Sequence, residues 1–175
     1  MYQITANSKG FTLIELMVTV SIFSISTLFS LGFIGKLLEK NKVSADTMRL
    51  LSLISQARNS AISHNRDTYF CSINSEQDCQ RQWQTVVVMT KDTQHNKILA
   101  QHQLKANYHN VNWSSFQRKA YLAFNSRGYS KHQNGTLYLC HDNYSDLSRA
   151  IVVSKSGRAR IVKQSHALAQ KCQKT

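Results

Sequence analysis

The segment FTLIELMVTVSIFSISTLFSLGFIG, from Phe11 to Gly35, contains a single charged residue, Glu15. As an α-helix, these 25 residues would extend about 37 Å at 1.5 Å per residue, which is enough to cross the apolar core of a bilayer. The apolar run is longer than that of a secretory signal peptide, and no small-x-small cleavage signature follows it. We therefore expect residues 11–35 to form a transmembrane helix that stays attached to the protein.

Glu15 lies almost at the start of this apolar run. A carboxylate in hydrocarbon is costly and is usually retained for a partner. A buried carboxylate and a buried ammonium each cost several kcal/mol alone, and pairing them offsets most of that cost. The sequence therefore predicts that Glu15 pairs with a cation when the helix is buried.

The residues from Lys9 to Met17, Lys-Gly-Phe-Thr-Leu-Ile-Glu-Leu-Met, resemble the cleavage-and-helix motif of type IV pilins and type II secretion pseudopilins. The resemblance implies that residues 1–10 are a leader, which a prepilin peptidase removes between Gly10 and Phe11. It also implies that Phe11 becomes N-methylated and that Glu15 pairs with the amine of a neighbouring pilin subunit. Before assembly such a subunit lies in the bacterial inner membrane with its N-terminus in the cytoplasm. The alternative is an ordinary single-span anchor with Glu15 at headgroup depth.

The length and charge of the chain limit its architecture and its partners. With 175 residues, it has room for one modest domain plus an appended segment. Its 22 Lys and Arg residues against nine Asp and Glu residues give a net charge of +13, which favours polyanionic partners. Residues 151–175 contain six Lys or Arg residues and no acid, so the sequence places the polyanion site near the C-terminal end.

Residues 36–66 contain no proline or glycine and predict the amphipathic half of a long helix. Its apolar residues recur mostly at three-residue and four-residue intervals: Leu37, Val43, Met48, Leu51, Ile54, Ala57 and Ala61. Residues 67–175 must cover this stripe, and they contain runs rich in β-branched and aromatic residues that predict strands. These runs are Thr68 to Ile73, Thr85 to Thr90, Ile98 to Leu104, Ala120 to Phe124, Thr136 to Cys140, Ala150 to Ser154 and Ala159 to Lys163.

The expected fold class is therefore α+β, with a long N-terminal helix packed on an antiparallel sheet. This is the type IV pilin fold that the resemblance implies. The resemblance also places the β-rich domain in the periplasm, and after assembly at the cell surface in a pilus.

The four cysteines, Cys71, Cys79, Cys140 and Cys172, allow three disulfide pairings. An exported domain of this size is expected to oxidise them. We favour Cys71 with Cys79, around a short polar loop, and Cys140 with Cys172, which ties the basic C-terminal end to a strand. A zinc site is the alternative, but no CxxC pair is present.

The sequence contains no pattern typical of an enzyme or a cofactor protein. The seven histidines are scattered without an HExxH motif, and no Walker loop, dinucleotide glycine fingerprint or GxSxG motif occurs. None of the nine acids forms a convincing catalytic pair. We therefore expect neither catalysis, nor a metal, nor a cofactor.

The last two predicted strands flank a turn and indicate a basic hairpin. If Ala159 and Ile161 face the core, the two-residue period turns Arg158 and Arg160 outward together, with Cα atoms about 6.6 Å apart. This separation is close to one phosphate step along an extended strand of nucleic acid, so each guanidinium can bind its own phosphate. Lys155 and Lys163 extend the row, and Gly157 leaves room for a backbone to approach. A solvated basic hairpin without a ligand is the alternative.

The residues of this hairpin resemble the C-terminal signature of FimT-type minor pilins in the FimT/GspH-like family. The residues that carry the resemblance are Arg149 to Ser154 and Ser156 to Arg160, together with Trp83 and a helix end that comprises Ser55, Ala57, Arg58, Ala61, Ile62 and Asn65. The family's GRxR motif, here Gly157, Arg158 and Arg160, implies DNA binding during natural transformation. Four further cations are candidate outlying contacts: Arg127, Lys131, Arg118 and Lys119.

Three functions fit the sequence. The first is a minor type IV pilin, competent for DNA uptake, that binds double-stranded DNA through phosphate contacts without sequence preference. The second is a structural minor pseudopilin of a type II secretion system, which needs no DNA. The third is a domain that docks on anionic lipid, which the position of the charge, far from the apolar span, argues against.

Overall fold

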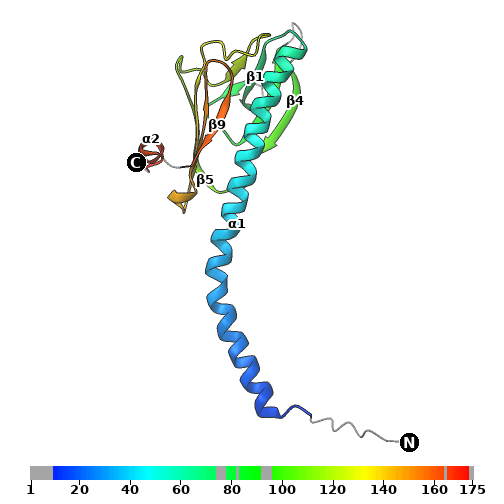
Figure 1. The fold of residues 1–175 in the computed structure, drawn as a ribbon, viewed down its shortest axis with the longest axis vertical. Helices are drawn as coiled ribbons and strands as arrows, with labels where there is room; N and C mark the ends of the chain where they lie inside the picture. The colour runs from blue at the N-terminus through cyan, green and yellow to red at the C-terminus, as the bar shows by residue number, and fades with distance from the viewer. Residues whose placement is uncertain (1–9, 74–77, 82, 92–95, 164, 174–175) are drawn as a thin grey trace, which may run out of the picture. The chain divides into compact units, whose positions relative to one another are not determined.

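A computed structural model describes residues 10–73, 78–81, 83–91, 96–163 and 165–173. Residues 1–9 of the expected leader lie outside the described residues. The chain divides into two compact units, Met1–Leu38 and Glu39–Thr175. The longest element, helix α1, comprises Leu13–Ser63 and contributes residues to both units (Figure 1).

The described part of the first unit is the beginning of α1. The Thr12 hydroxyl accepts a hydrogen bond from the Glu15 backbone N–H at 3.3 Å, so Thr12 caps the helix. Glu15 is the third residue after this cap, in the first turn, where a carboxylate is favoured by the helix dipole. None of the helices in the described residues combines the length and the apolarity needed to cross a bilayer.

In the second unit, α1 presents a buried stripe to the domain. The stripe repeats at intervals of three and four residues, and its apolar members are Val43, Leu50, Leu53, Ile54, Ala57 and Ala61. Two residues expected in this stripe, Leu37 and Met48, are instead 45% and 59% exposed. The polar residues Asp46 and Thr47 occupy the buried turn beside Met48, because their side chains find hydrogen-bond partners there.

Five strands form the first antiparallel sheet, sheet A. Its main path has the order β2-β1-β3-β4, and β6 lies off this path and pairs with the first half of β1. The strands are β1 (Thr68–Ile73), β2 (Cys79–Gln80), β3 (Thr85–Lys91), β4 (Asn96–Gln103) and β6 (Leu122–Phe124).

Four strands form the second antiparallel sheet, sheet B, in the order β5-β7-β8-β9. They are β5 (Tyr108–Ser115), β7 (Gly135–His141), β8 (Arg149–Val153) and β9 (Ala159–Val162). Two short helices complete the domain: the 3-10 helix η1 (Ser145–Leu147) and α2 (His166–Lys171). All seven strands predicted from the sequence are present, whereas β2, β5, η1, α2 and the division into two sheets were not predicted.

One apolar core joins α1 to both sheets. It contains Leu53 and Ala57 from α1, Phe70 and Val88 from sheet A, and Ile151 from sheet B, all fully buried. Burial of each of the larger side chains in this set, Leu53, Phe70, Val88 and Ile151, contributes about 1.5–3 kcal/mol. The Glu39–Thr175 unit therefore coheres through the second half of α1.

The disulfides have the pairing that we favoured from the sequence. Cys71 bonds to Cys79 and Cys140 bonds to Cys172, with Cα atoms 5.6 and 5.2 Å apart. The second bond ties α2 to the end of β7, because Cys172 is the C-cap residue of α2.

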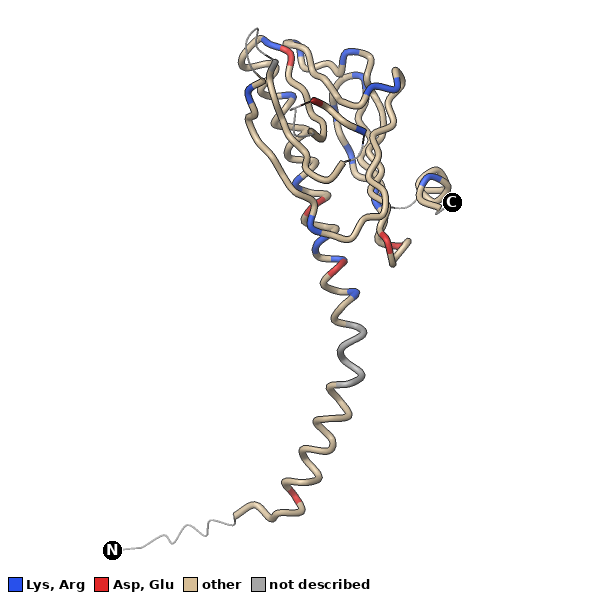
Figure 2. The backbone as a smooth tube through the Cα atoms, turned by 180° about the vertical axis from the view of Figure 1, so that it is seen from behind, with Lys and Arg blue, Asp and Glu red and all other residues tan. Residues whose placement is uncertain are grey.

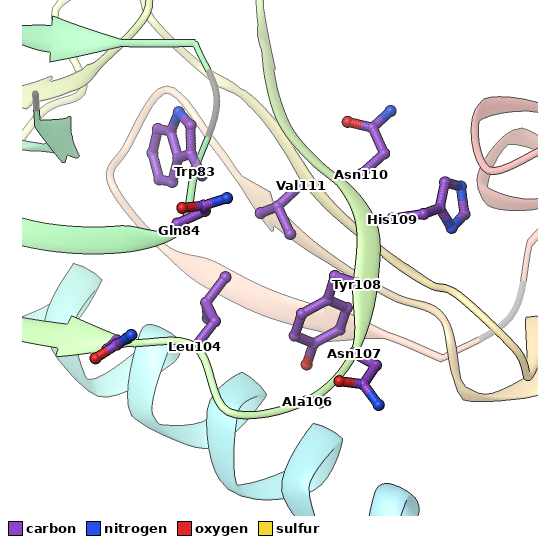
Figure 3. A pocket seen from close by; sticks show the side chains of 10 residues that line it. Trp83, Gln84, Leu104, Ala106, Asn107, Tyr108, His109, Asn110 and Val111 are labelled. Atoms are coloured by element: carbon purple, nitrogen blue, oxygen red, sulfur yellow. The ribbon is translucent and has the colours of Figure 1, made fainter.

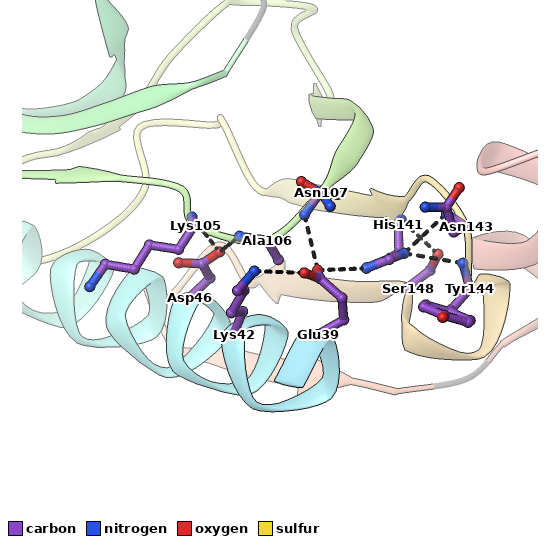
Figure 4. A network of polar contacts seen from close by, with 10 residues as sticks. All are labelled: Glu39, Lys42, Asp46, Lys105, Ala106, Asn107, His141, Asn143, Tyr144 and Ser148. Atoms are coloured by element: carbon purple, nitrogen blue, oxygen red, sulfur yellow. Dashed lines mark hydrogen bonds and ion pairs between the residues drawn. The ribbon is translucent and has the colours of Figure 1, made fainter. Parts of the chain in front are cut away.

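A polar network fastens α1 to the loop between β4 and β5 (Figure 4). The buried Asp46 carboxylate accepts hydrogen bonds from the backbone N–H groups of Lys105 and Ala106, both at 2.9 Å, and lies 2.9 Å from His102 Nε2. Glu39, about two helical turns earlier in α1, accepts a hydrogen bond from the Asn107 backbone N–H at 3.3 Å. The two carboxylates thus accept hydrogen bonds from backbone N–H groups of the loop, which have no strand partner there.

His141 links Glu39 to sheet B. Its Nδ1 accepts from the backbone N–H groups of Asn143 and Tyr144, at 3.2 and 3.1 Å, so the ring proton lies on Nε2 and is donated to Glu39 at 3.1 Å. The Lys42 ammonium, 2.7 Å from the carboxylate, lowers the pKa of Glu39, and the hydrogen bonds from His141 and Asn107 lower it further.

The depressed pKa of Glu39 gives a pH dependence of stability. Ionised Glu39 stabilises the fold above the ordinary pKa of a glutamate, about 4.3, and this stabilisation is lost as the pH falls through the lower, folded-state pKa. In Glu39→Gln, we expect the free energy of unfolding to be reduced near neutral pH and to approach the wild-type value in acid. Urea unfolding at several pH values measures the difference, and parallel profiles for the two proteins would contradict this role of Glu39.

Candidate nucleic-acid interface

The turn between β8 and β9, residues 154–158, is closed by its own hydrogen bonds. The Ser154 backbone N–H donates to the Arg158 carbonyl at 2.9 Å, and the Gly157 N–H donates to the Ser154 carbonyl at 2.9 Å. The Arg158 N–H in turn donates to the Ser154 hydroxyl at 3.2 Å. The predicted hairpin is therefore present, with a turn of defined geometry.

Gly157 is buried against another loop of the same chain, which corrects our expectation that it leaves room for a ligand. Its φ of +78° lies in the left-handed region that favours glycine. A Cβ atom at this position would lie 2.3 Å from the Gly128 carbonyl oxygen. The glycine of the GRxR motif thus permits a close approach between two backbones of the protein.

Arg58 of α1 lies beneath both loops. Its Nε donates to the Gly128 carbonyl at 3.1 Å, and its Cδ and Nε would lie 3.1 Å from a Cβ on Gly157. Gly128 also has a positive φ, +77°, and a Cβ there would meet Ile62 and Arg58. A further contact joins the loops directly, because the Ser130 N–H donates to the Lys155 carbonyl at 3.1 Å.

The two arginines of the motif are both exposed. Ala159 and Ile161 pack on the core, as expected, and the alternation of β9 turns Arg160 to the opposite face, across from Val152 on β8. Arg158 lies in the turn itself, just before β9 begins. The flanking cations, Lys155 in the turn and Lys163 after the end of β9, are exposed as well.

Two of the outlying cations lie on the loop that contacts the turn, but only one is available to a ligand. Arg127 is exposed one residue before Gly128. Lys131 instead donates a hydrogen bond to the Asp67 carboxylate, which raises the pKa of Lys131. Because its ammonium is paired with Asp67, Lys131 is less available than Arg127 to a ligand.

Arg118 and Lys119 lie on a different loop, at the end of β5. With Arg81, which the sequence did not single out, they line a groove of about 340 Å³. Figure 2 shows Lys and Arg on several loops of the Glu39–Thr175 unit. The structural role of Arg58 was also missed, because no pattern in the sequence indicates that Arg58 contacts Gly128 and Gly157. Arg81 was missed because the sequence does not give its distance from Arg118 and Lys119.

A second hollow, of about 390 Å³, lies between β3 and β5 (Figure 3). Its described lining contains no Lys, Arg, Asp or Glu, so it is a poor site for a polyanion. Tyr108 lines it, and burial raises the pKa of Tyr108 far above its usual value, which keeps the phenol protonated. In the part of the chain that the structure describes, no three His, Cys, Asp or Glu residues are placed to share a metal ion.

The comparisons with known proteins bear on the family and the fold. A family model described as type II transport protein GspH matches residues 46–157, which is more than half of the chain. The chain belongs to the GspH family. A model of the prokaryotic N-terminal methylation motif matches residues 5–31 of this GspH-family chain, around Gly10, Phe11 and Glu15. No curated protein matches the chain significantly.

Solved structures show that this GspH-family chain has the fold of a type IV minor pilin. A crystal structure of the type IV minor pilin FimU from Pseudomonas aeruginosa has a TM-score of 0.56 at 17% identity, covering 72% of this chain and 92% of FimU. A second crystal form of FimU gives a TM-score of 0.52 at 16% identity, covering 68% and 91%. The pilin fold predicted from the sequence is confirmed, with two sheets in place of one.

Gly157→Ala tests the contact between the two loops. The added Cβ has no room beside the Gly128 carbonyl, and alanine disfavours a φ of +78°. We expect the free energy of unfolding to fall by about 1–3 kcal/mol in urea denaturation. Stability of Gly157→Ala equal to that of the wild type would contradict the proposed contact.

Proposed function

We propose that this GspH-family chain is a minor type IV pilin that binds DNA through its GRxR turn and takes part in DNA uptake during natural transformation. The observation that carries the proposal is the pair of exposed arginines, Arg158 and Arg160, held by a turn whose glycine is packed against Gly128. Because the turn is fixed before a ligand arrives, little conformational entropy is lost when the guanidiniums bind phosphates. This arrangement supports a phosphate-binding role for the motif.

The ligand's chemistry follows from the charge of the site. Guanidiniums bind phosphate oxygens with two parallel hydrogen bonds, and such contacts carry no base sequence information. Residues 151–175 contain six cations and no acid, which favours a long polyanion over a single small anion. We therefore infer sequence-independent, salt-sensitive binding of DNA, with Lys155 and Lys163 adding to the attraction and Arg127 next to the contacting loop.

A structural pseudopilin of a type II secretion system is the second candidate. It is favoured by the family model, which describes a type II transport protein and ends at Gly157, before Arg158 and Arg160. In that case the basic hairpin is solvated and binds no DNA. Measurement of DNA binding separates the two functions.

The N-terminal unit supports a processed, membrane-anchored pilin. We propose that the prepilin peptidase cleaves between Gly10 and Phe11, and that Phe11 is then methylated, as the methylation motif over residues 5–31 suggests. The apolar side chains just before and at the start of α1 are largely exposed, with Phe11 at 79% and Leu13 at 77%, and they need to be covered by lipid or by another subunit. Glu15 would pair with the amine of a neighbouring subunit.

Five hydroxyl groups between residues 19 and 27 of α1 are compatible with an apolar environment. Each of the five donates to a carbonyl one turn earlier, at 2.8–2.9 Å: Thr19 to Leu16, Ser21 to Met17, Ser24 to Val20, Ser26 to Ile22 and Thr27 to Ser24. A satisfied hydroxyl avoids the cost of an unpaired polar group in hydrocarbon. We propose that residues 11–35 lie in the inner membrane, N-terminus inside, until the subunit joins a pilus with its C-terminal domain outside.

Arg158→Gln combined with Arg160→Gln tests DNA binding. We expect weaker binding of the full-length protein, in detergent, to random-sequence duplexes, and a salt slope reduced by about 0.9 for each lost phosphate contact. Fluorescence anisotropy across a salt series measures both. The loss is expected to be equal for unrelated DNA sequences, because only phosphates are contacted.

The matched control is Lys97→Gln combined with Lys105→Gln, which removes the same charge from exposed positions on β4 and the loop after it. This control is expected to bind DNA nearly as the wild type does. If the wild type does not bind, or if both double variants bind equally well, the DNA-binding proposal is wrong and the structural pseudopilin is favoured.

Gly10→Val tests processing. The peptidase is expected to require a small residue before the cut, so the variant should keep its leader when expressed with a prepilin peptidase. The intact mass of the purified protein distinguishes the precursor from a mature chain that begins at methylated Phe11. A Gly10→Val protein of mature mass would refute cleavage at this site.

A further inference from the structure

The groove beside β5 is a second cationic feature, separate from the GRxR turn. It follows β5, which is an end strand of sheet B in the described part of the chain. Its described lining includes three cations and no carboxylate. The polar residues that line it are Arg81, Asn110, Asn112, Ser114, Ser115, Arg118 and Lys119.

The strand register places this groove and the GRxR turn at the same end of sheet B. Ser115 at the end of β5 pairs with Gly135, Gly135 pairs with Val153, and Val153 pairs with Ala159. The loop with Arg118 and Lys119 therefore begins where β5 ends, in the same row across the sheet as the turn. Three strand spacings of about 4.8 Å separate β5 from β9, or about 14 Å.

The loop that bears Arg118 and Lys119 is anchored to the end of β5. The Arg118 backbone N–H donates to the Ser115 carbonyl and the Lys119 N–H donates to the Ser115 hydroxyl, both at 3.1 Å. Arg118 has a φ of +54°, a conformation that costs a non-glycine residue free energy and is kept where the surroundings enforce it. Both cations thus extend from a backbone of fixed conformation.

We propose that this groove is a second phosphate-binding site, which contacts the same DNA duplex as the GRxR turn. The inference rests on the proposed DNA-binding function and adds Arg81, Arg118 and Lys119 to the contacts. Phosphates follow one another at 3.4 Å per base pair along a duplex, so about 14 Å corresponds to about four phosphate steps. Because the duplex is stiff over this distance, one molecule of DNA laid across the end of sheet B reaches both sites at once.

Two sites on one rigid sheet make the second contact effectively intramolecular. A duplex offers phosphates at fixed spacing and can occupy both sites without being ordered first. A single strand must be ordered to span them, and this costs conformational entropy. The groove therefore increases the preference of the protein for duplex over single-stranded DNA.

The test compares two charge-removing double variants of the full-length protein in detergent. One is Arg118→Gln with Lys119→Gln, and the other is the Lys97→Gln, Lys105→Gln control. The probes are a random duplex of about 20 base pairs and one of its single strands, each titrated across a salt series. Thermal unfolding of each protein checks that the fold is retained, and Arg118→Lys with Lys119→Arg keeps the charge in the groove.

We expect the groove variant to lose about 1.8 from the salt slope for duplex, equivalent to about 60-fold in affinity at about 0.1 M salt if both contacts are made. The loss should be smaller for the single strand, and the charge-preserving variant should bind duplex as the wild type does. If the groove variant binds duplex as well as the Lys97, Lys105 control does, the second site is wrong. The groove is then either solvated or a site for an acidic peptide along β5.

The two proposals fail in different ways. If the wild type binds duplex and loses it only on removal of Arg158 and Arg160, the second site is wrong and the DNA-binding function stands. If the wild type binds no DNA at all, both are wrong.

Discussion

The close backbone contact between Gly157 and Gly128 is the constraint on which the proposed interface depends. A Cβ at Gly157 would collide with the Gly128 carbonyl, and a Cβ at Gly128 would collide with Ile62 of α1. Both glycines also have the positive φ that a side chain disfavours. The contact joins the β8–β9 turn to the loop before β7, and the Arg58 hydrogen bond joins that loop to α1. The glycine of the GRxR motif therefore has a structural role, and its arginines are left to face outward.

The basic residues of the domain have different roles despite their common charge. Arg58 is partly buried and supports a loop, and Lys131 is paired with Asp67. Arg158 and Arg160 are exposed, on a turn and on the outer face of sheet B. In the proposed function, net charge attracts a polyanion to the whole domain, and the rigid turn determines which phosphates the two arginines contact.

Local patterns in the sequence predicted the elements but not their assembly. β1 has the predicted bounds because Thr68–Ile73 is a run of β-branched, aromatic and other buried residues. β5 was missed because its exposed positions carry Asn and Ser, which are typical of turns, although Val111 and Trp113 alternate with them. The burial of Asp46 depends on backbone donors 59 and 60 residues away, and no periodicity reports such a partner.

The same limit applies to the candidate site. Sequence patterns identified Gly157, Arg158 and Arg160, but we interpreted Gly157 as leaving space for a ligand. No pattern in the sequence indicates that the Gly128 carbonyl fills that space. From the sequence alone, Arg118 and Lys119 could not be placed relative to the GRxR turn. The register of sheet B shows that their loop begins at the same end of the sheet as the turn. Which cations share one surface depends on strand pairing between distant residues, and local sequence patterns do not report that pairing.

Hydrogen–deuterium exchange of the full-length protein, with and without a random-sequence DNA duplex, tests the central claim most directly, because it locates the ligand on the backbone. The account predicts that DNA slows exchange in residues 154–160, at the GRxR turn and the start of β9. Binding that leaves exchange in residues 154–160 unchanged would contradict the account.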